Sequence, residues 1–426
     1  MPTPSLLIVP ARFKTGKLYS QIPTSGAGDF TVTRNTEARR FDSAGLVASI
    51  ASGIPRLDYY TSGGVTGCPA LLVEPSGTNL CLQSENFSTT WSPTNTVVSG
   101  NVAGTTDPAG GNTAEQIFET VTSGNHFLAQ TMTIVSGTTY VGSVFYKKAA
   151  GSPDWMQVAF STTGLAGFAN FNLTSGTVGL TGAGCTGRIE NYGNGWYRCI
   201  LIQTATANGT SGGPIIVFTN NTNSATRFVS YAGNTATSIY AWGAQLETGT
   251  VATSYIPTTT GTGSRSADVV SVSGAVSGSI GQTEGTLYAE IVAQPYNNAS
   301  FPAILQVDDG ADSQRFAIFI NSIGGIRVRF NASGVNTNSD STTPATLVVG
   351  QTYKIAAAFG FNGSQALYIN GVFQVSGSVT AGPFTAALNR VMLGHRAGVS
   401  SPFLIRSAAL YTTRLTNAEL ATLTTL

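Results

Sequence analysis

Short runs in which apolar and polar residues alternate dominate the middle of the chain. They recur at intervals of roughly 8 to 12 residues and are separated by clusters of Gly, Asn and Ser, a pattern typical of β-sandwiches. In "GTTYVGSVFYKK", the alternation places Val141 and Phe145 on one face of a strand and Tyr140 and Tyr146 on the other. We therefore predict a first β-sandwich over residues 84–258.

A second β-sandwich is predicted over residues 283–426. In "GQTYKIAAAF", the residues Tyr353, Ile355, Ala357 and Phe359 recur at every second position, so they line one face of a strand. Strand patterns of this kind outnumber helical ones throughout the chain. The fold class that follows is all-β, with two tandem β-sandwiches.

Two hairpins are predicted within the second sandwich. In "ALYINGVFQV", Asn370-Gly371 separates two alternating runs, and a type I′ turn needs positive φ at both of its central positions. In "FAIFINSIGGIRVRF", Arg327 and Arg329 face water while the apolar residues that alternate with them face the core.

One helix is predicted, at the end of the chain. In "RLTNAELATLTTL", Thr416 is the N-cap and Glu419 stands three residues later, the pattern of a capping box. The helix is barely two turns long, so we expect it to cover the rim of a sandwich.

Two further segments lack clean alternation. Residues 1–83 contain several Pro-directed turns, among them Ile54-Pro55 and Glu74-Pro75, and are predicted to be an attachment or oligomerisation segment that packs against a partner. Residues 259–282 are low in complexity and are predicted to be a linker with one or two short strands.

Composition narrows the classes of partner. Only 10% of the residues are charged, the formal net charge is +1, and basic residues gather only in pairs such as Arg39-Arg40 and Lys147-Lys148. Proteins that track phosphates carry a basic stripe, so a nucleic-acid partner is not expected.

Neither a transmembrane segment nor a signal peptide is expected. No apolar run approaches the ~20 residues that span a bilayer, and residues 1–4 lack the basic start and apolar centre of a signal peptide. We expect a protein that is made inside a cell without a membrane partner and that leaves the cell, if it acts outside, by another route.

The four cysteines are Cys68, Cys81, Cys185 and Cys199. They are too sparse for a disulfide scaffold and match no zinc spacing. We expect four buried thiols, with a Cys185–Cys199 bridge as the less favoured alternative.

Catalytic patterns are weak. The two histidines, His126 and His395, stand beside turn glycines without a nucleophile-elbow context, which favours structural or surface roles. Glu115 and Glu119 could form the acid pair that cleaves a glycosidic bond, but a strand with one solvated face is the favoured interpretation. No catalytic residue is predicted.

Two candidate binding sites remain. In "VDDGADSQRF", Asp308, Asp309 and Asp312 surround a glycine and offer hard oxygen ligands for Ca²⁺, although their spacing departs from that of an EF-hand and a solvated acidic turn is favoured. Sugars stack on aromatic rings, so the tryptophans are candidate glycan platforms, although a single tryptophan is more often part of a core. The candidates are Trp91, Trp155 and Trp196.

A last cluster lies in "YAWGAQLETGTVATSYIPTT", residues 240–259. Trp242, Gln245 and Glu247 could bind a ligand, or they could mark the last strand of the first sandwich. The second interpretation is favoured: Gln245 and Glu247 would then bind nearby backbone and fix the exit of the chain.

Several phrases resemble a modular arrangement found in structural proteins and fibres of tailed bacteriophages. They are "PRLDY", "LLVEP", "TNL", "NGWYRC", "YAWGAQLETGTVATSYIPTT" and "SRSADV", all between residues 41 and 268. The resemblance implies that residues 84–258 form a jelly roll like those of carbohydrate-binding modules. The phrases "YINGVF" and "ALYTTRLTNAELATL" make the C-terminal part similar to concanavalin A-like, laminin-G-type domains.

The resemblance implies a non-enzymatic virion protein, most simply a tail-fibre-like adhesin that binds host-surface glycans. Its implied partners are other virion proteins, bound through the N-terminal segment, and two further copies in a homotrimer. A capsid-attached head fibre or decoration protein is the main alternative, and a polysaccharide depolymerase a weaker one. The implied location is the virion, assembled in the host cytoplasm.

Overall fold

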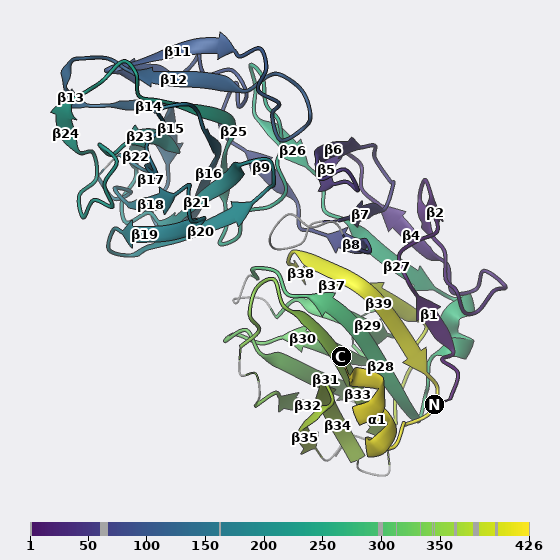
Figure 1. Ribbon diagram of the computed structural model, residues 1–426. Coiled ribbons are helices and arrows are strands. Elements are labelled where there is room, and N and C mark those ends of the chain that lie inside the picture. The colour runs from purple at the N-terminus through teal and green to yellow at the C-terminus, as the bar shows by residue number, and fades with distance from the viewer. Residues whose placement is uncertain are drawn as a thin grey trace.

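The computed structural model describes residues 2–59, 67–161, 163–296, 301–311, 313–332, 334–342, 344, 346–361, 364–377, 383–396 and 399–425. The described chain is built of strands, with one short 3-10 helix, η1 (Ala275–Ser279), and one α-helix, α1 (Asn417–Thr424). The strands form two lobes (Figure 1). Among the helices that are described, none has the length and apolarity to cross a bilayer.

The first lobe is a sandwich of two six-stranded sheets. One sheet has the order β10 (Ser92–Thr94), β14 (Phe127–Ala129), β23 (Ile215–Phe218), β17 (Trp155–Ala159), β18 (Phe168–Asn172) and β19 (Thr177–Thr181). The other has the order β11 (Thr96–Asn101), β12 (Glu115–Glu119), β25 (Ser238–Thr248), β16 (Thr139–Lys148), β21 (Trp196–Thr204) and β20 (Cys185–Asn191). Two small ribbons complete it, β13 (Ser123–Asn125) with β24 (Ser230–Ala232) and β15 (Thr131–Ile134) with β22 (Gly209–Gly212).

The second lobe is a sandwich of two larger sheets. The eight-stranded sheet has the order β35 (Val372–Gly377), β34 (Ser364–Ile369), β33 (Thr352–Gly360), β28 (Glu284–Val292), β39 (Phe403–Tyr411), β8 (Ala70–Val73) and β7 (Arg56–Asp58), and β1 (Leu6–Ile8) also pairs with β39. The nine-stranded sheet has the order β2 (Phe13–Lys14), β3 (Lys17–Leu18), β4 (Phe30–Thr33), β27 (Val269–Ser273), β36 (Arg390–Leu393), β29 (Ala303–Asp308), β30 (Arg315–Ile320), β31 (Ile326–Ala332) and β32 (Val335–Asp340). The remaining ribbons are β5 (Ala38–Phe41) with β6 (Val47–Ile50), β9 (Gly77–Asn79) with β26 (Gly263–Arg265), and β37 (His395–Arg396) with β38 (Val399–Ser400).

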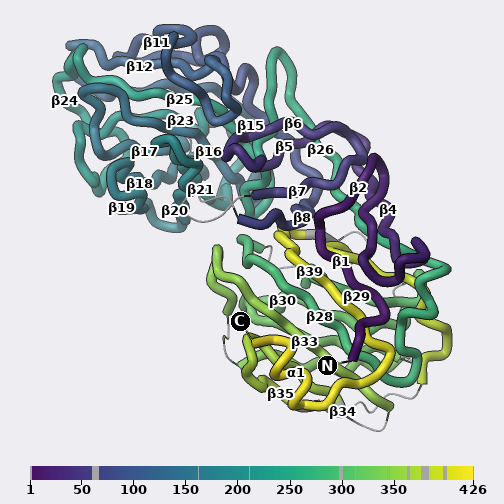
Figure 2. The backbone as a smooth tube through the Cα atoms, turned by 45° about the vertical axis from the view of Figure 1, so that its right-hand side comes forward, coloured from purple at the N-terminus to yellow at the C-terminus, as the bar shows by residue number. Residues whose placement is uncertain are grey.

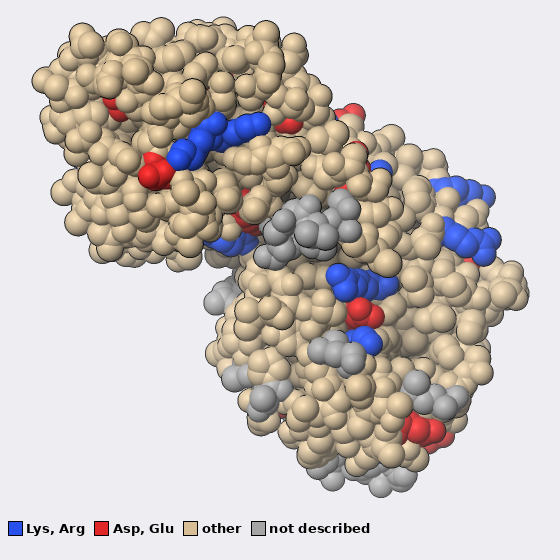
Figure 3. All heavy atoms as spheres, in the orientation of Figure 1, with Lys and Arg blue, Asp and Glu red and all other residues tan. Residues whose placement is uncertain are grey.

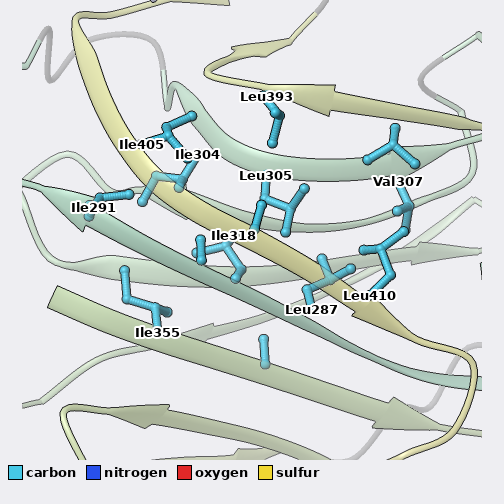
Figure 4. Close-up of a cluster of buried hydrophobic side chains, with 14 of the residues drawn as sticks. Leu287, Ile291, Ile304, Leu305, Val307, Ile318, Ile355, Leu393, Ile405 and Leu410 are labelled. Carbon is cyan, nitrogen blue, oxygen red and sulfur yellow. The ribbon is translucent and has the colours of Figure 1, made fainter. Parts of the chain in front are cut away.

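The core of the second lobe lies between its two sheets. Leu287, Ile355 and Leu410 from the eight-stranded sheet meet Leu305 and Ile318 from the nine-stranded sheet (Figure 4). Alternation explains this arrangement, because every second residue of each strand faces the partner sheet. The all-β fold class with two β-sandwiches is confirmed.

The N-terminal segment completes the second sandwich, so its prediction as a segment separate from the sandwiches is wrong, while its role in attachment stays a prediction. Leu6 and Ile8 of β1 and Phe30 and Val32 of β4 are buried in the core of that sandwich, and β1 runs beside β39 (Figure 2). The short alternating runs in this segment do not indicate which strands they pair with, because those partners come from the far end of the chain.

The first lobe is therefore inserted into the second. The chain enters the first lobe after β9 and returns to the second through β26, and these two strands pair antiparallel. At the two ends of the insertion, the Ser84 amide donates to the Thr258 carbonyl at 3.2 Å. The predicted linker, residues 259–282, does contain two short strands, but β27 lies inside the nine-stranded sheet with Val270 buried. It is thus part of the second sandwich and not a free connection.

Several local predictions are confirmed. Asn370 and Gly371 have φ of 49° and 78° and join β34 to β35, and Thr416 and Glu419 form the capping box of α1. Arg327 and Arg329 lie half-buried on the outer side of β31, whose alternate residues are buried.

The cysteine predictions hold in part. All four thiols are free, so Cys185 and Cys199 form no bridge. Cys81 and Cys199 are buried, but Cys185 is only half-buried and Cys68 is exposed. The expectation of four buried thiols is wrong for these last two: Cys185 packs against the core of the first lobe but stays half-buried, and Cys68 is exposed.

Candidate functional site

The predicted glycan platforms differ in their exposure. Trp91 is 4% exposed and its ring meets Phe87 edge-on, while Trp196 is 1% exposed and donates to the Thr106 carbonyl at 2.9 Å. A buried ring cannot stack on a sugar, so both are core residues and their prediction as platforms is corrected. Trp155 is half-buried at the start of β17 and keeps an accessible part.

The predicted calcium ligands are not free to bind a cation. Both carboxylate oxygens of Asp308, which is buried, accept from Arg390, at 2.8 and 3.1 Å. Asp309 accepts from the backbone of its own turn, including Ala311 at 3.0 Å. Asp312 lies outside the described residues, among which no cluster of metal-ligating side chains occurs. The sequence did not reveal that Arg390 would pair with Asp308.

The two candidate acids of β12 are structural. Glu115 and Glu119 are both 3% exposed, which corrects the expectation of a solvated face. Glu115 accepts from the Phe87 amide, and Glu119 accepts from the Asn234 amide and the Tyr231 hydroxyl. Four residues of strand separate them by about 13 Å, more than the roughly 5 to 10 Å that a glycosidase pair requires.

His126 and His395 have structural surroundings. Both ring nitrogens of His126, which is fully buried, lie within hydrogen-bond distance of backbone carbonyls, those of Asn95 at 2.9 Å and Tyr231 at 3.2 Å. His395 is half-buried, and burial together with Arg390 lowers its pKa.

The cluster of residues 240–259 fixes the exit of the first lobe, as predicted. Gln245 accepts from the Ile256 amide at 2.7 Å, and Glu247 accepts from the Thr253 amide at 2.9 Å. Trp242 is buried against Tyr255, with ring centroids 4.5 Å apart. These side chains hold the returning chain against β25 and are not available to a ligand.

Beside this exit, five charged side chains meet in a buried cluster between the lobes. Its members are Arg34, Arg56, Glu74, Arg265 and Asp268. Charged side chains are few on the face of the molecule that Figure 3 shows, so this concentration of buried charge stands out. The phrases "PRLDY", "LLVEP" and "SRSADV" each supply part of it, which the sequence could not show because they are up to about two hundred residues apart.

Ion pairs connect the cluster. Arg56 donates to Glu74 at 2.6 Å and also to Asp268, and Arg34 donates to Asp268 at 3.0 Å. Arg265 also pairs with Glu74. Because an uncompensated buried charge is costly, the cluster locks the strands that carry it in place.

A cleft between the lobes lies against this cluster. It begins as a cavity of about 80 Å³ that receives residues from three parts of the chain. The β5–β7 region contributes Arg39, Arg40 and Asp58, the first lobe contributes Arg188, Glu190 and Tyr192, and the second contributes Gln294, Pro295, Pro402 and Leu404.

The cleft continues along the second lobe. A further hollow of about 230 Å³ shares Arg188, Glu190, Gln294 and Pro295 with the cavity and adds Val349 from the loop before β33. Together the two hollows reach the roughly 300 Å³ at which small-molecule sites begin, and such sites are common between domains.

Donors and acceptors in the cleft are unequally engaged. Glu190 is paired with Arg188 at 2.7 Å, and Asp58 accepts from the Phe41 amide at 2.8 Å. In contrast, the buried Nε atoms of Arg39, Arg40 and Arg188 have no hydrogen-bond partner among the described residues. The cleft therefore offers cationic donors, an aromatic ring and apolar walls to a ligand.

The chain is similar in part to known proteins. The chain has no match among curated proteins. A solved carbohydrate-binding module of a Ruminococcus gnavus sialidase, bound to sialyllactose, is 21% identical, with a TM-score of 0.30 over 34% of this chain and 84% of its own. Domain 4 of a Geobacillus stearothermophilus arabinanase, in complex with arabinotriose, is 20% identical, with a TM-score of 0.30 over 37% of this chain and 73% of its own.

The family comparison gives the clearest assignment. Residues 268–421 match the family model described as the concanavalin A-like lectin/glucanases superfamily. These residues supply the strands β27 to β39 that form most of both sheets of the second lobe. The second lobe is a concanavalin A-like, lectin-type β-sandwich.

Proposed function

We propose that this chain is a non-enzymatic adhesin that binds glycans in the cleft between its lobes. The observation that carries the proposal is the cleft itself, in which Arg188, Tyr192 and Gln294 line a hollow beside a lectin-type sandwich. Sugars bind where a few polar groups converge on an apolar or aromatic wall.

A depolymerase fits the cleft less well. Hydrolysis of a glycosidic bond needs one carboxyl group that gives a proton and another that attacks or activates water. Asp58 and Glu190 line the cleft, but each already accepts from the chain itself. If purified protein released reducing ends from capsule polysaccharide, the non-enzymatic proposal would be wrong.

The proposed setting is a bacteriophage virion, in a tail fibre or alternatively in a head fibre or decoration protein. This part rests on the resemblance of the phrases between residues 41 and 268. Immunogold labelling of virions separates the tail from the head, and light scattering of the purified chain tests the implied homotrimer. Unlabelled virions would contradict the virion assignment altogether.

A glycan array of the intact chain tests glycan binding. We expect binding to a subset of bacterial surface glycans and a loss of at least tenfold in affinity in Gln294→Trp, because Gln294 lines both hollows and a large ring there would fill them. Trp155→Ala is the matched variant on the first lobe and should leave affinity unchanged. If Trp155→Ala abolished binding and Gln294→Trp did not, the glycan site would lie at Trp155.

A further inference from the structure

We infer that the sugar bound in the cleft between the lobes is acidic and carries a carboxylate or a sulfate. This inference rests on the proposed glycan-binding function and names the class of ligand for the same site. It follows from the excess of arginines over carboxylates in and behind the cleft, from the unused hydrogen-bond donors of these arginines, and from the apolar wall opposite them.

The arginines of the cleft are partly shielded from bulk water and are not fully hydrogen-bonded. Arg39, Arg40 and Arg188 are half-buried, and the Nε atom of each is buried with no partner among the described residues. A partly desolvated guanidinium favours a nearby anion more strongly than one in water does, because the effective dielectric constant is lower.

The terminal nitrogens of these arginines have few hydrogen-bond acceptors. Arg40 donates to the Leu57 carbonyl at 2.7 Å, and Arg39 has Glu37, an exposed carboxylate, at 3.7 Å. Arg188 pairs with Glu190 through one terminal nitrogen. A guanidinium carries five N–H donors, so each of the three retains capacity for a further acceptor.

The carboxylates near the cleft do not cancel this capacity. Glu74 is buried, and it accepts from Arg56, Arg265 and both the amide and the hydroxyl of Ser254. Arginines also outnumber carboxylates among the residues that line the cavity or form the cluster behind it, six to four: Arg34, Arg39, Arg40, Arg56, Arg188 and Arg265 against Asp58, Glu74, Glu190 and Asp268.

The opposite wall suits the body of a sugar. Pro295, Pro402 and Leu404 present apolar surface from the second lobe, and Gln294 offers an amide for hydroxyl groups. A ring that carries one acidic group could place that group toward the arginines and its C–H face toward the prolines. A neutral ring would leave the arginine donors with hydroxyl acceptors alone, which form weaker hydrogen bonds than a carboxylate does.

Titration calorimetry of the intact chain with paired oligosaccharides tests the inference. In each pair the same oligosaccharide ends either in glucuronic acid or in glucose. We expect the acidic member to bind at least tenfold more tightly at low salt, and we expect this preference to shrink at high salt because mobile ions screen the interaction.

Two cleft variants and one matched control identify the groups responsible. Arg188→Gln and Arg39→Gln should each reduce the preference to about twofold or less, and Arg188→Lys should retain part of it, because lysine keeps the charge but lacks the planar fork. Arg406→Gln is the control: Arg406 also has a buried Nε without a partner among the described residues, but it lies outside the cleft. It should keep the full preference.

Each outcome decides a different point. If the acidic and neutral members bound equally well, or if the preference survived both cleft variants, the ligand would not be acid-specific and glycan binding itself would stand. If no member of any pair bound, the proposed glycan-binding function would be contradicted together with this inference. Melting curves for every variant exclude loss of folding as the cause.

Discussion

Glu74 is bound by several buried partners at the junction between the lobes. Its carboxylate accepts from Arg56 at 2.6 Å and from the Ser254 amide at 2.8 Å. Burial opposes its ionisation, but the charges of Arg265 and Arg56 outweigh burial and lower its pKa from 4.5 to about 2. The charged form is therefore the one that the fold requires.

Replacement of this carboxylate should weaken the fold at neutral pH. We expect Glu74→Gln to lower the free energy of unfolding by about 3 kcal/mol, because it leaves buried arginines without their counter-charge. Calorimetric melting measures the effect. Glu290→Gln is the control, since Glu290 lies 3.8 Å from Arg406 near the surface and such a pair contributes at most about 1 kcal/mol. Equal losses in both variants would contradict a special role for the cluster.

Acid should remove the same contribution. A group whose pKa is lower in the folded chain stabilises it fully above the unfolded pKa and stops doing so as the pH falls through the folded pKa. For Glu74 that window runs from 4.5 down to about 2. We expect the wild-type chain to lose stability over this window more steeply than Glu74→Gln, as measured by chemical denaturation at each pH. Parallel curves would show that Glu74 titrates normally.

The β34–β35 hairpin shows how much a single element owes to local sequence. Asn370 and Gly371 adopt the positive φ that the turn requires, and the Gly371 amide donates to Thr424 of α1 at 3.0 Å. The dipeptide predicted this turn from sequence alone, because few residues tolerate that backbone conformation.

A methyl group at this turn should cost stability. Gly371→Ala should destabilise the second lobe by about 1 to 2 kcal/mol, because an L-residue at a φ of 78° is strained. Gly278→Ala in η1 is the control: a Cβ there meets nothing within 4 Å and its φ is not positive. We expect that variant to melt within about 0.5 kcal/mol of the wild type. If Gly371→Ala left the free energy of unfolding unchanged, the turn would be able to relax around the added methyl group.

Strand partners, in contrast, were not predictable at the scale of elements. The strands of residues 1–83 were too short for their alternation to be recognised, and their partners lie up to about 400 residues away: Leu6 pairs with Leu410 and Val270 with Val32. Alternation along a strand predicts that a residue faces a core, but it does not predict which of the two cores the residue enters. The buried glutamates of β12 escaped prediction for a related reason, since only the tertiary structure supplies the amides that satisfy them.

The insertion of one sandwich into the other is the main property of the whole molecule. Both ends of the first lobe meet at Ser84 and Thr258, so the lobe can be removed without parting the strands of the second. Residues 1–83, however, bury Leu6, Ile8 and Phe30 in the second lobe, and each such side chain contributes about 1.5 to 3 kcal/mol.

Two deletions distinguish an inserted lobe from a tandem one. A chain that lacks residues 85–257, with a short Gly-Ser loop in their place, should retain a cooperative melting transition for the second lobe. A chain that begins at residue 268 should instead be unfolded or aggregated, because it lacks strands β1 to β4, β7 and β8 from both sheets. Cooperative melting of this shorter chain at the temperature of the full chain would contradict the inserted arrangement.

The sequence by itself determined much of the local structure of this protein: the longer strands after residue 83, the Asn370-Gly371 turn, the capped helix and the exit at Gln245 and Glu247. These follow from residues that are neighbours in the chain. Only the tertiary structure decided that the N-terminal segment completes the second sandwich, that Trp91 and Trp196 are buried, and that six arginines gather at one junction. Those outcomes depend on contacts between segments far apart in the chain, which periodicity and spacing do not encode.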